Sequence, residues 1–394
     1  MKNLPKLIHI TVWMWSAVLA GGLASQAAIA APFVPTSDNQ VLQKLPARAA
    51  DPVAKELATL RSSASQRPKD PATQAALVQR YVDLANAQGD PRYIGYADAV
   101  VSAFAGPLSP ELLTLKGVLR QYRHDFQGAL QDFAQALTLD PSYAQAHAWR
   151  GAIYLVQADY SAARKECTAL KQLGRDALHG ACLGLTQSYS GDLPAGYETL
   201  RQALAQARST ASQLWLLTRM GEVAAWQGQT AIARQHYQQA LALGQDDIYL
   251  LAAWSDFLLD NGQAADVVKL LSSWESADSL LVRLAIAETL TGSPKAAAHV
   301  KMLADRFAAA RARGDTTHLA EESRFELQVR KDAPTALRLA QENYAYQREP
   351  RDARVLLEAA VVARQAPAAQ PVVDWLSASQ FGDLRMKQLA KELK

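Results

Sequence analysis

Turn-like residue pairs recur along this chain at intervals of about 34 residues. The second residues of six clear pairs are separated in turn by 35, 34, 33, 37 and 34 positions, and amphipathic stretches lie between them. A fixed period of this length is typical of a solenoid in which each repeat is one helical hairpin. The six pairs are Gly89-Asp90, His124-Asp125, Ala158-Asp159, Gly191-Asp192, Gly228-Gln229 and Gly262-Gln263.

Three weaker breaks extend the same period toward the C-terminus, at Gly292-Ser293, Lys331-Asp332 and Gln365-Ala366. Nine turns at this spacing require about 306 residues, and residues 70–380 supply 311. The period therefore predicts one continuous array and leaves no room for a separate catalytic domain.

Composition agrees with closely packed helices. Ala (75) and Gly (20) together make up about a quarter of the 394 residues. Ala has the lowest cost in a helix, whereas sheets favour β-branched and aromatic residues. The formal net charge is +3, and it falls to +1 without Lys2 and Lys6, which lie in the N-terminal segment described below. A nucleic-acid partner is not expected, because phosphate binding needs a clustered positive surplus.

The stretch from Gly117 to Pro141 resembles a tetratricopeptide repeat, with small residues, a polar turn and a closing Asp-Pro. In that family the eighth, twentieth and twenty-seventh positions are small because two helices touch there. Four successive units carry Gly or Ala at 11 of these 12 positions, the exception being Leu170. The small positions are Gly117, Ala129, Ala136, Gly151, Ala163, Gly184, Gly196, Ala203, Gly221, Ala233 and Ala240.

The resemblance implies an all-α fold, an α-solenoid of about nine hairpins wound as a right-handed superhelix. We expect an N-terminal helix in 51–69, the repeat array in 70–280, degenerate repeats or a helical cap in 281–380, and a C-terminal helix or tail in 381–394. The repeat pattern weakens at the unit beginning near Ile248, where the three small positions hold Ser255, Val267 and Trp274.

The resemblance also implies a concave groove lined by the first helix of each hairpin. Five aromatic and three acidic side chains at these positions suggest a peptide carrying apolar and basic side chains. The alternative is that the aromatic rings only fill space between helices, and Trp226, beside the Gly228 turn, is the strongest candidate for that role. The groove positions are Gln121, Tyr122, Tyr189, Trp215, Glu222, Trp226, Tyr249, Asp256 and Asp260.

Residues 1–30 read as a secretory signal peptide. Lys2 and Lys6 precede an apolar run from Leu7 to Ala24, and small residues at Ala28 and Ala30 predict cleavage after Ala30. An uncleaved membrane anchor is the alternative, because the run approaches the length of a bilayer span. Residues 31–50 contain three prolines without periodicity and read as a leader. We expect a periplasmic protein that does not insert into the membrane after cleavage.

The two cysteines, Cys167 and Cys182, lie in the exported part of the chain, fifteen residues apart. A disulfide is the expected state in an oxidising compartment. A soft-metal site is an alternative, because His179 precedes Cys182 by three residues, and two free buried thiols are another. A second weak metal candidate is His318 with Glu322, although we expect a helix start there, with Arg324 paired to Glu321.

No nucleophile elbow, zinc-binding helix motif or phosphate-binding loop occurs in the sequence. We therefore expect no enzymatic activity and no cofactor. The hypothesis is an exported scaffold or adaptor that binds a peptide or an envelope protein in its groove, with homo-oligomerisation possible. The alternative is a metal-handling or assembly accessory protein that uses His and Cys side chains.

Overall fold

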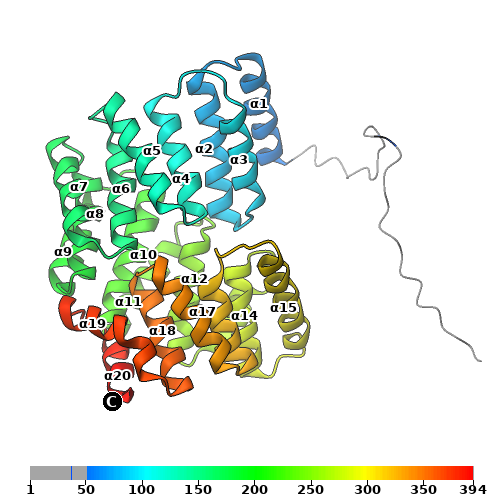
Figure 1. Ribbon diagram of the computed structural model, residues 1–394, viewed down its shortest axis with the longest axis vertical. Coiled ribbons are helices and arrows are strands. Elements are labelled where there is room, and N and C mark those ends of the chain that lie inside the picture. Colours follow the sequence, from blue (N-terminus) through cyan, green and yellow to red (C-terminus); the bar gives the residue numbers. More distant parts are fainter. Residues whose placement is uncertain (1–36, 38–50, 394) are drawn as a thin grey trace, which may run out of the picture. The chain divides into compact units, whose positions relative to one another are not determined.

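The computed structural model describes Ser37 and residues 51–393. The predicted signal peptide and the rest of the leader lie outside the described residues. Residues 51–393 belong to one compact unit, and every regular element described in it is helical. Helices of alternating direction stack side by side (Figure 1). This confirms the predicted all-α solenoid.

Within residues 51–393 one helix precedes nine hairpins, and a last helix follows them. In the first part of the chain the helices are α1 (Pro52–Gln66), α2 (Pro71–Gln88), α3 (Arg92–Ala103), α4 (Pro110–Tyr122), α5 (Phe126–Leu139), α6 (Ala144–Val156), α7 (Tyr160–Gln172), α8 (Asp176–Tyr189), α9 (Leu193–Gln206), α10 (Thr210–Trp226) and α11 (Thr230–Leu241).

The second part of the chain continues the stack with less regular lengths. Its elements are α12 (Ile248–Asp260), α13 (Ala264–Leu271), α14 (Asp278–Thr291), α15 (Ala296–Ala312), α16 (Leu319–Phe325), the π-helix η1 (Glu326–Arg330), α17 (Ala333–Tyr346), α18 (Pro350–Ala363), the 3-10 helix η2 (Ala366–Ala369), α19 (Gln370–Ser379) and α20 (Leu384–Glu392).

All nine turns predicted from the period lie between the two helices of a hairpin. Each contains or adjoins one residue with left-handed backbone, the conformation that commonly ends a helix and reverses the chain. Five of these residues are glycines, which adopt it without steric cost, and one of the five, Gly191, has φ +105°. The left-handed residues are Gly89, His124, Ala158, Gly191, Gly228, Gly262, Gly292, Lys331 and Arg364.

The uneven spacing of the weaker turns has a structural cause. The interval of 30 residues before Gly292-Ser293 contains α13, which has only eight residues. The next interval of 39 residues contains α15, which has 17, and the π-helical turn η1. The hairpin architecture therefore persists to the end of the chain while helix lengths vary.

Small residues lie where paired helices touch, as the family pattern implies. A Cβ atom added at Gly117 would lie 2.5 Å from the Phe133 ring, and one at Gly184 would lie 2.7 Å from Leu200. At Gly196 it would lie 2.6 Å from the carbonyl oxygen of Gly184, which belongs to the neighbouring backbone and cannot swing away. These glycines set the distance between the helices of a hairpin.

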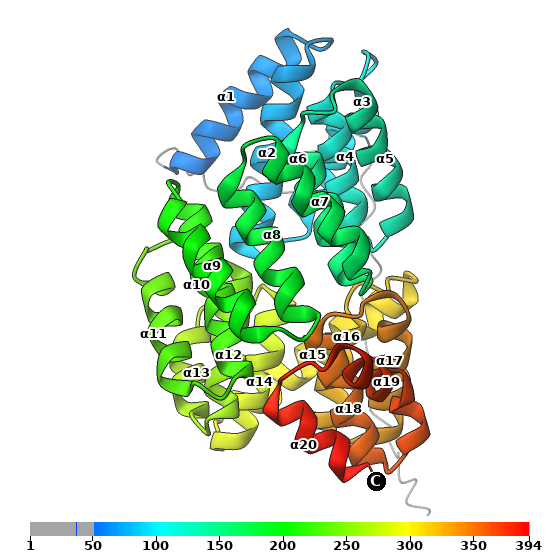
Figure 2. The ribbon, with the colours of Figure 1, turned by 90° about the vertical axis from the view of Figure 1, so that its left-hand side faces the viewer.

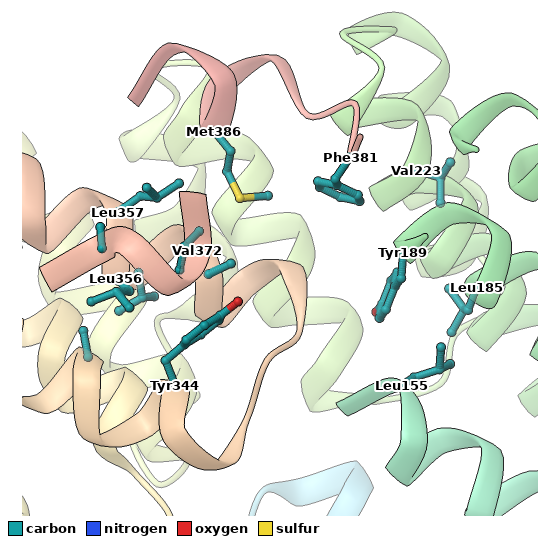
Figure 3. Packing of buried hydrophobic residues seen from close by; sticks show 14 of the residues in the cluster. Leu155, Leu185, Tyr189, Val223, Tyr344, Leu356, Leu357, Val372, Phe381 and Met386 are labelled. Atoms are coloured by element: carbon teal, nitrogen blue, oxygen red, sulfur yellow. The ribbon is translucent and has the colours of Figure 1, made fainter. Parts of the chain in front are cut away.

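The C-terminal helices return to pack against the middle of the chain. One buried cluster contains Leu155, Leu185 and Val223, from α6, α8 and α10, together with residues of α17 to α20. Figure 3 shows Phe381 and Met386 from the C-terminal segment in this cluster, with Tyr189 opposite Phe381. In Figure 2 the red helix α20 lies at the lower edge of the stack. The solenoid therefore closes on itself.

The predicted disulfide is present between Cys167 and Cys182. It joins α7, the second helix of one hairpin, to α8, the first helix of the next. Its closed loop of about 15 residues contributes on the order of 3 kcal/mol in the chain-entropy account of cross-links.

Substitution at Gly196 tests the close helix contact. We expect Gly196→Ala to lower the free energy of unfolding by about 1–3 kcal/mol, because the methyl group meets backbone atoms of α8. Gly95 is the matched control: it is exposed inside α3, and an added Cβ there has no neighbour within 4 Å. Gly95→Ala should raise the unfolding free energy by about 0.5–1 kcal/mol. Urea denaturation measures both, and equal effects would contradict the contact.

Candidate protein-binding groove

The predicted acidic groove residues Asp256 and Asp260 lie one turn apart on α12. Asp256 accepts hydrogen bonds from Arg283 of α14 at 2.9 and 2.7 Å, and Arg324 of α16 lies 2.8 Å from its other side. Burial alone would raise the pKa of Asp256, but the guanidinium groups of Arg283 and Arg324 outweigh burial and hold it well below its usual range. Asp256 is therefore ionised and fully paired.

Asp260 is held in the same way by the helices that follow. Arg354 of α18 donates two hydrogen bonds to its carboxylate, both of 2.6 Å, and Arg385 of α20 donates a third of 2.7 Å. Arg354 also donates to Glu358 at 2.8 Å. Two-pronged contacts of this kind are among the strongest hydrogen bonds between side chains.

The two carboxylates of α12 thus meet arginines from α14, α16, α18 and α20 in turn. Basic side chains occupy the predicted acidic groove, and in this structure they come from the same chain. A partner that uses Asp256 or Asp260 has to replace one of these arginines.

A second part of the groove is a stack of aromatic rings and guanidinium groups on α10 and α12. The Arg219 guanidinium lies 4.1 Å from the ring centroid of Tyr249 and 5.4 Å from that of Trp215. Burial raises the pKa of Tyr249 well above its ordinary value near 10, so its hydroxyl keeps its proton and donates to Glu222 at 2.6 Å. Arg351 lies on the same Tyr249 ring at 5.7 Å.

Tyr189 and Trp226 face the C-terminal segment. Tyr189 is buried, and its ring centroid lies 5.9 Å from that of Trp226, which in turn lies 5.3 Å from Phe381. Trp226 therefore packs between α8 and the segment that follows α19, and it also lines the cavity described below.

Gln121 and Tyr122 lie at the end of α4, away from these clusters. The Tyr122 hydroxyl donates to Asn86 of α2, and burial raises the pKa of Tyr122 above its ordinary value. Neither residue lines the cavity beside Asp256 and Asp260.

A cavity of about 380 Å³ remains between α10, α12 and the C-terminal helices. Its walls include Glu222, Trp226, Glu321 and Arg351. The Arg351 side chain is 53% exposed, although Glu349 pairs with it at 3.2 Å. The groove is therefore partly filled by the chain itself and partly accessible.

The residues that fill the groove were not predicted from the sequence. Arg324 was expected to pair with Glu321, and this was wrong: its guanidinium reaches Asp256 of α12. Arg219 carried a usable signal, since positions 215, 219, 222 and 226 fall on one face of a helix. Arg354 and Arg385 carried none, because their partner lies 94 and 125 positions away.

The metal candidates do not assemble into a site. The Cys182 sulfur is bonded to Cys167, and His179 Nδ1 donates to the Cys167 carbonyl oxygen at 2.8 Å. Glu322 is buried and pairs with Arg311, while His318 precedes α16. Within residues 51–393 no group of three or more His, Cys, Asp or Glu side chains is arranged to hold a metal ion. None of the helices described there is long and apolar enough to cross a bilayer.

Comparison with known proteins yields distant structural likenesses only. No family model and no curated protein matches the sequence. Among solved structures, the Cut9-Hcn1 APC/C hetero-tetramer aligns over 78% of this chain at 14% identity and a TM-score of 0.40. This chain spans about half, 52%, of that matched chain.

Two further structures align in a similar way. The TPR domain of P58(IPK) aligns over 81% of this chain and 95% of its own, at 14% identity and a TM-score of 0.23. Naa15/Naa10 bound to HypK-THB aligns over 86% of this chain and 63% of the other, at 13% identity and a TM-score of 0.27. Likenesses this distant assign no partner. The chain's own hairpins, turns and small-residue contacts show an α-solenoid whose hairpins resemble tetratricopeptide repeats.

Asp352, on the cavity wall, makes stability depend on pH. Burial raises its pKa to about 7, so between about pH 4 and 7 the folded chain binds a proton that the unfolded chain releases. The free energy of unfolding therefore falls as pH rises through this range, by on the order of 2 kcal/mol between pH 5 and 8. The Asp352→Asn variant should not show this decrease in the free energy of unfolding.

The measurement is urea denaturation of the wild type and Asp352→Asn at pH 5 and pH 8. Asn343 donates to Asp352 at 2.9 Å, and its amide can rotate to accept from the new side chain. Asp305→Asn, on the exposed surface of α15, controls for the loss of one negative charge. The same pH dependence in the wild type and Asp352→Asn would contradict the assignment.

Proposed function

We propose that this chain is a non-catalytic, periplasmic scaffold or adaptor that binds a peptide segment of another envelope protein in its concave groove. The observation that carries the proposal is the stack of Trp215, Arg219, Tyr249 and Arg351, which leads from the surface to the cavity. Trp, Tyr and Arg are the residue types that contribute most to protein-binding surfaces.

Exposure along this stack supports binding. Trp215 is 36% exposed although it is a large apolar residue on the face of α10 that bears Glu222. The exposed half of Arg351 and the carboxylate of Glu321 line the adjoining cavity. An extended segment that covers Trp215 and enters the cavity would find both an apolar surface and charged groups of each sign.

The proposed compartment rests on the N-terminal segment and is supported by the disulfide. Cross-links such as Cys167–Cys182 persist in oxidising compartments and are rare in the cytosol.

Site-specific cross-linking tests the groove. We expect p-benzoylphenylalanine at position 215 of the full chain, expressed in its native cell, to cross-link to a second protein on illumination. The same residue at Tyr96, which is 47% exposed on α3, is the control. No adduct beyond that at position 96 would contradict groove binding, and adducts only with the same chain would replace it by a homo-oligomeric scaffold.

Export is tested by the N-terminus and the thiols of the purified protein. The mature chain should begin at Ala31 and contain no free thiol after denaturation. A variant that lacks residues 2–24 should stay in the cytosol and titrate two thiols, because that compartment keeps cysteines reduced. An exported chain that retains residues 1–30 would instead be a membrane-anchored protein.

A further inference from the structure

The last residue of α19 and the segment that follows it cross the edge of the solenoid in the way a bound peptide would. We name residues 379–393 the C-terminal strap. Its Ser379 carbonyl lies against Gly191, Gly382 lies against Leu193, and Leu384 lies against Gly228. Arg385 then reaches Asp260. The strap therefore touches the turn regions of three consecutive hairpins, α8/α9, α10/α11 and α12/α13.

Two side chains anchor the strap. The Phe381 ring is fully buried between Trp226 and Trp375, with centroid distances of 5.3 and 5.0 Å. Met386 is also buried, and it begins the part of α20 that faces the core. Trp375 belongs to α19, and its indole nitrogen donates to the Tyr160 hydroxyl of α7 at 2.7 Å. This contact holds α19 to the solenoid without the strap.

The rest of the strap is partly exposed: Asp383 is buried and caps α20, and Leu389 and Leu393 are partly buried against the core, whereas most other side chains of α20 lie at the surface. α20 has nine residues, below the length at which an isolated helix is stable. Leu384 is 60% exposed and Arg385 is 49% exposed. Within the described residues, Arg385 supplies the ion pairs of α20 with the rest of the chain, to Asp260 and to Glu358 at 3.5 Å.

Release of the strap would leave neither Asp260 nor Glu358 without an ion-pair partner. Arg354 remains bound to both Asp260 and Glu358 when Arg385 leaves. Release of the strap would expose the faces of Trp226 and Trp375 that Phe381 covers. An apolar side chain of a partner would have to cover them again. The site thus accepts an aromatic side chain and, four positions later, a basic one.

We propose that the C-terminal strap is a displaceable occupant of the groove edge, and that the partner is a peptide with the same pattern. That pattern is an aromatic residue, a basic residue four positions on and an apolar residue directly after it, as in Phe381, Arg385 and Met386. The inference rests on the proposed function, because it names the chemistry of the partner that the groove takes.

The probe is a fluorescent synthetic peptide of residues 379–393, titrated against the full chain by anisotropy. The tethered strap competes with it, so loosening the strap raises the fraction of chains that can bind. We expect Arg385→Gln to bind the probe about tenfold more tightly than the wild type. A probe with Phe381→Ala should not bind either protein.

Arg338→Gln is the matched control, since Arg338 is similarly exposed (56%) and pairs with Glu342 on α17. It should bind the probe as the wild type does. Thermal denaturation checks that both variants fold, which is expected because Asp260 and Glu358 keep Arg354. Equal affinity of the wild type and Arg385→Gln, no binding to either, or tight binding of the Phe381→Ala probe would overturn the proposal.

The two proposals fail separately. Cross-links from position 215 without probe binding would leave groove binding standing and remove the strap mechanism. Probe binding that strengthens in Arg385→Gln without any cross-link from position 215 would support the strap and remove the proposed function of the Trp215 surface.

Discussion

The close contact of paired helices at small residues is the constraint on which the rest of the structure depends. Gly117, Gly184 and Gly196 bring neighbouring helices so near that a methyl group would collide. Hairpins of similar thickness then stack with their turns along one edge. That alignment allows a segment as short as the C-terminal strap to touch three hairpins in succession, because Gly191, Gly228 and Asp260 lie along its path.

Electrostatics explains why the groove is filled. Asp256 and Asp260 project from adjacent turns of α12, and unpaired carboxylates among buried side chains would be costly. Arginines from α14, α16, α18 and α20 remove that cost, so each of these four helices is joined to α12 by an ion pair. Two arginines share Asp260, which makes one of them dispensable. The same ion pairs hold the C-terminal helices against α12. The ion pair of Arg385 with Asp260 is the one that a partner can replace.

Local signals predicted the fold well. A left-handed residue accompanies each of the nine turns, and the small positions mark helix contacts, so both could be read from neighbouring residues. The disulfide was equally local, since Cys167 and Cys182 lie on consecutive helices. The contents of the groove were not local. Phe381 and Trp226 are 155 positions apart in the sequence, and no period relates a groove residue to the distant segment that covers it.

Because the chain's own C-terminal segment partly fills the groove, the selectivity for a partner depends on that segment as well as on the groove. In the proposed mechanism a partner competes with the chain's own strap, and only the difference between the two sets of contacts contributes to binding. Phe381 already fills the aromatic site, so an apolar residue alone gains little there. The surfaces that the strap leaves uncovered, Trp215 and the exposed half of Arg351, are where a partner can add contacts that the strap lacks. Discrimination between partners should therefore depend on Trp215 and Arg351. The contacts of Phe381 and Arg385 set the binding free energy that a partner must exceed to displace the strap.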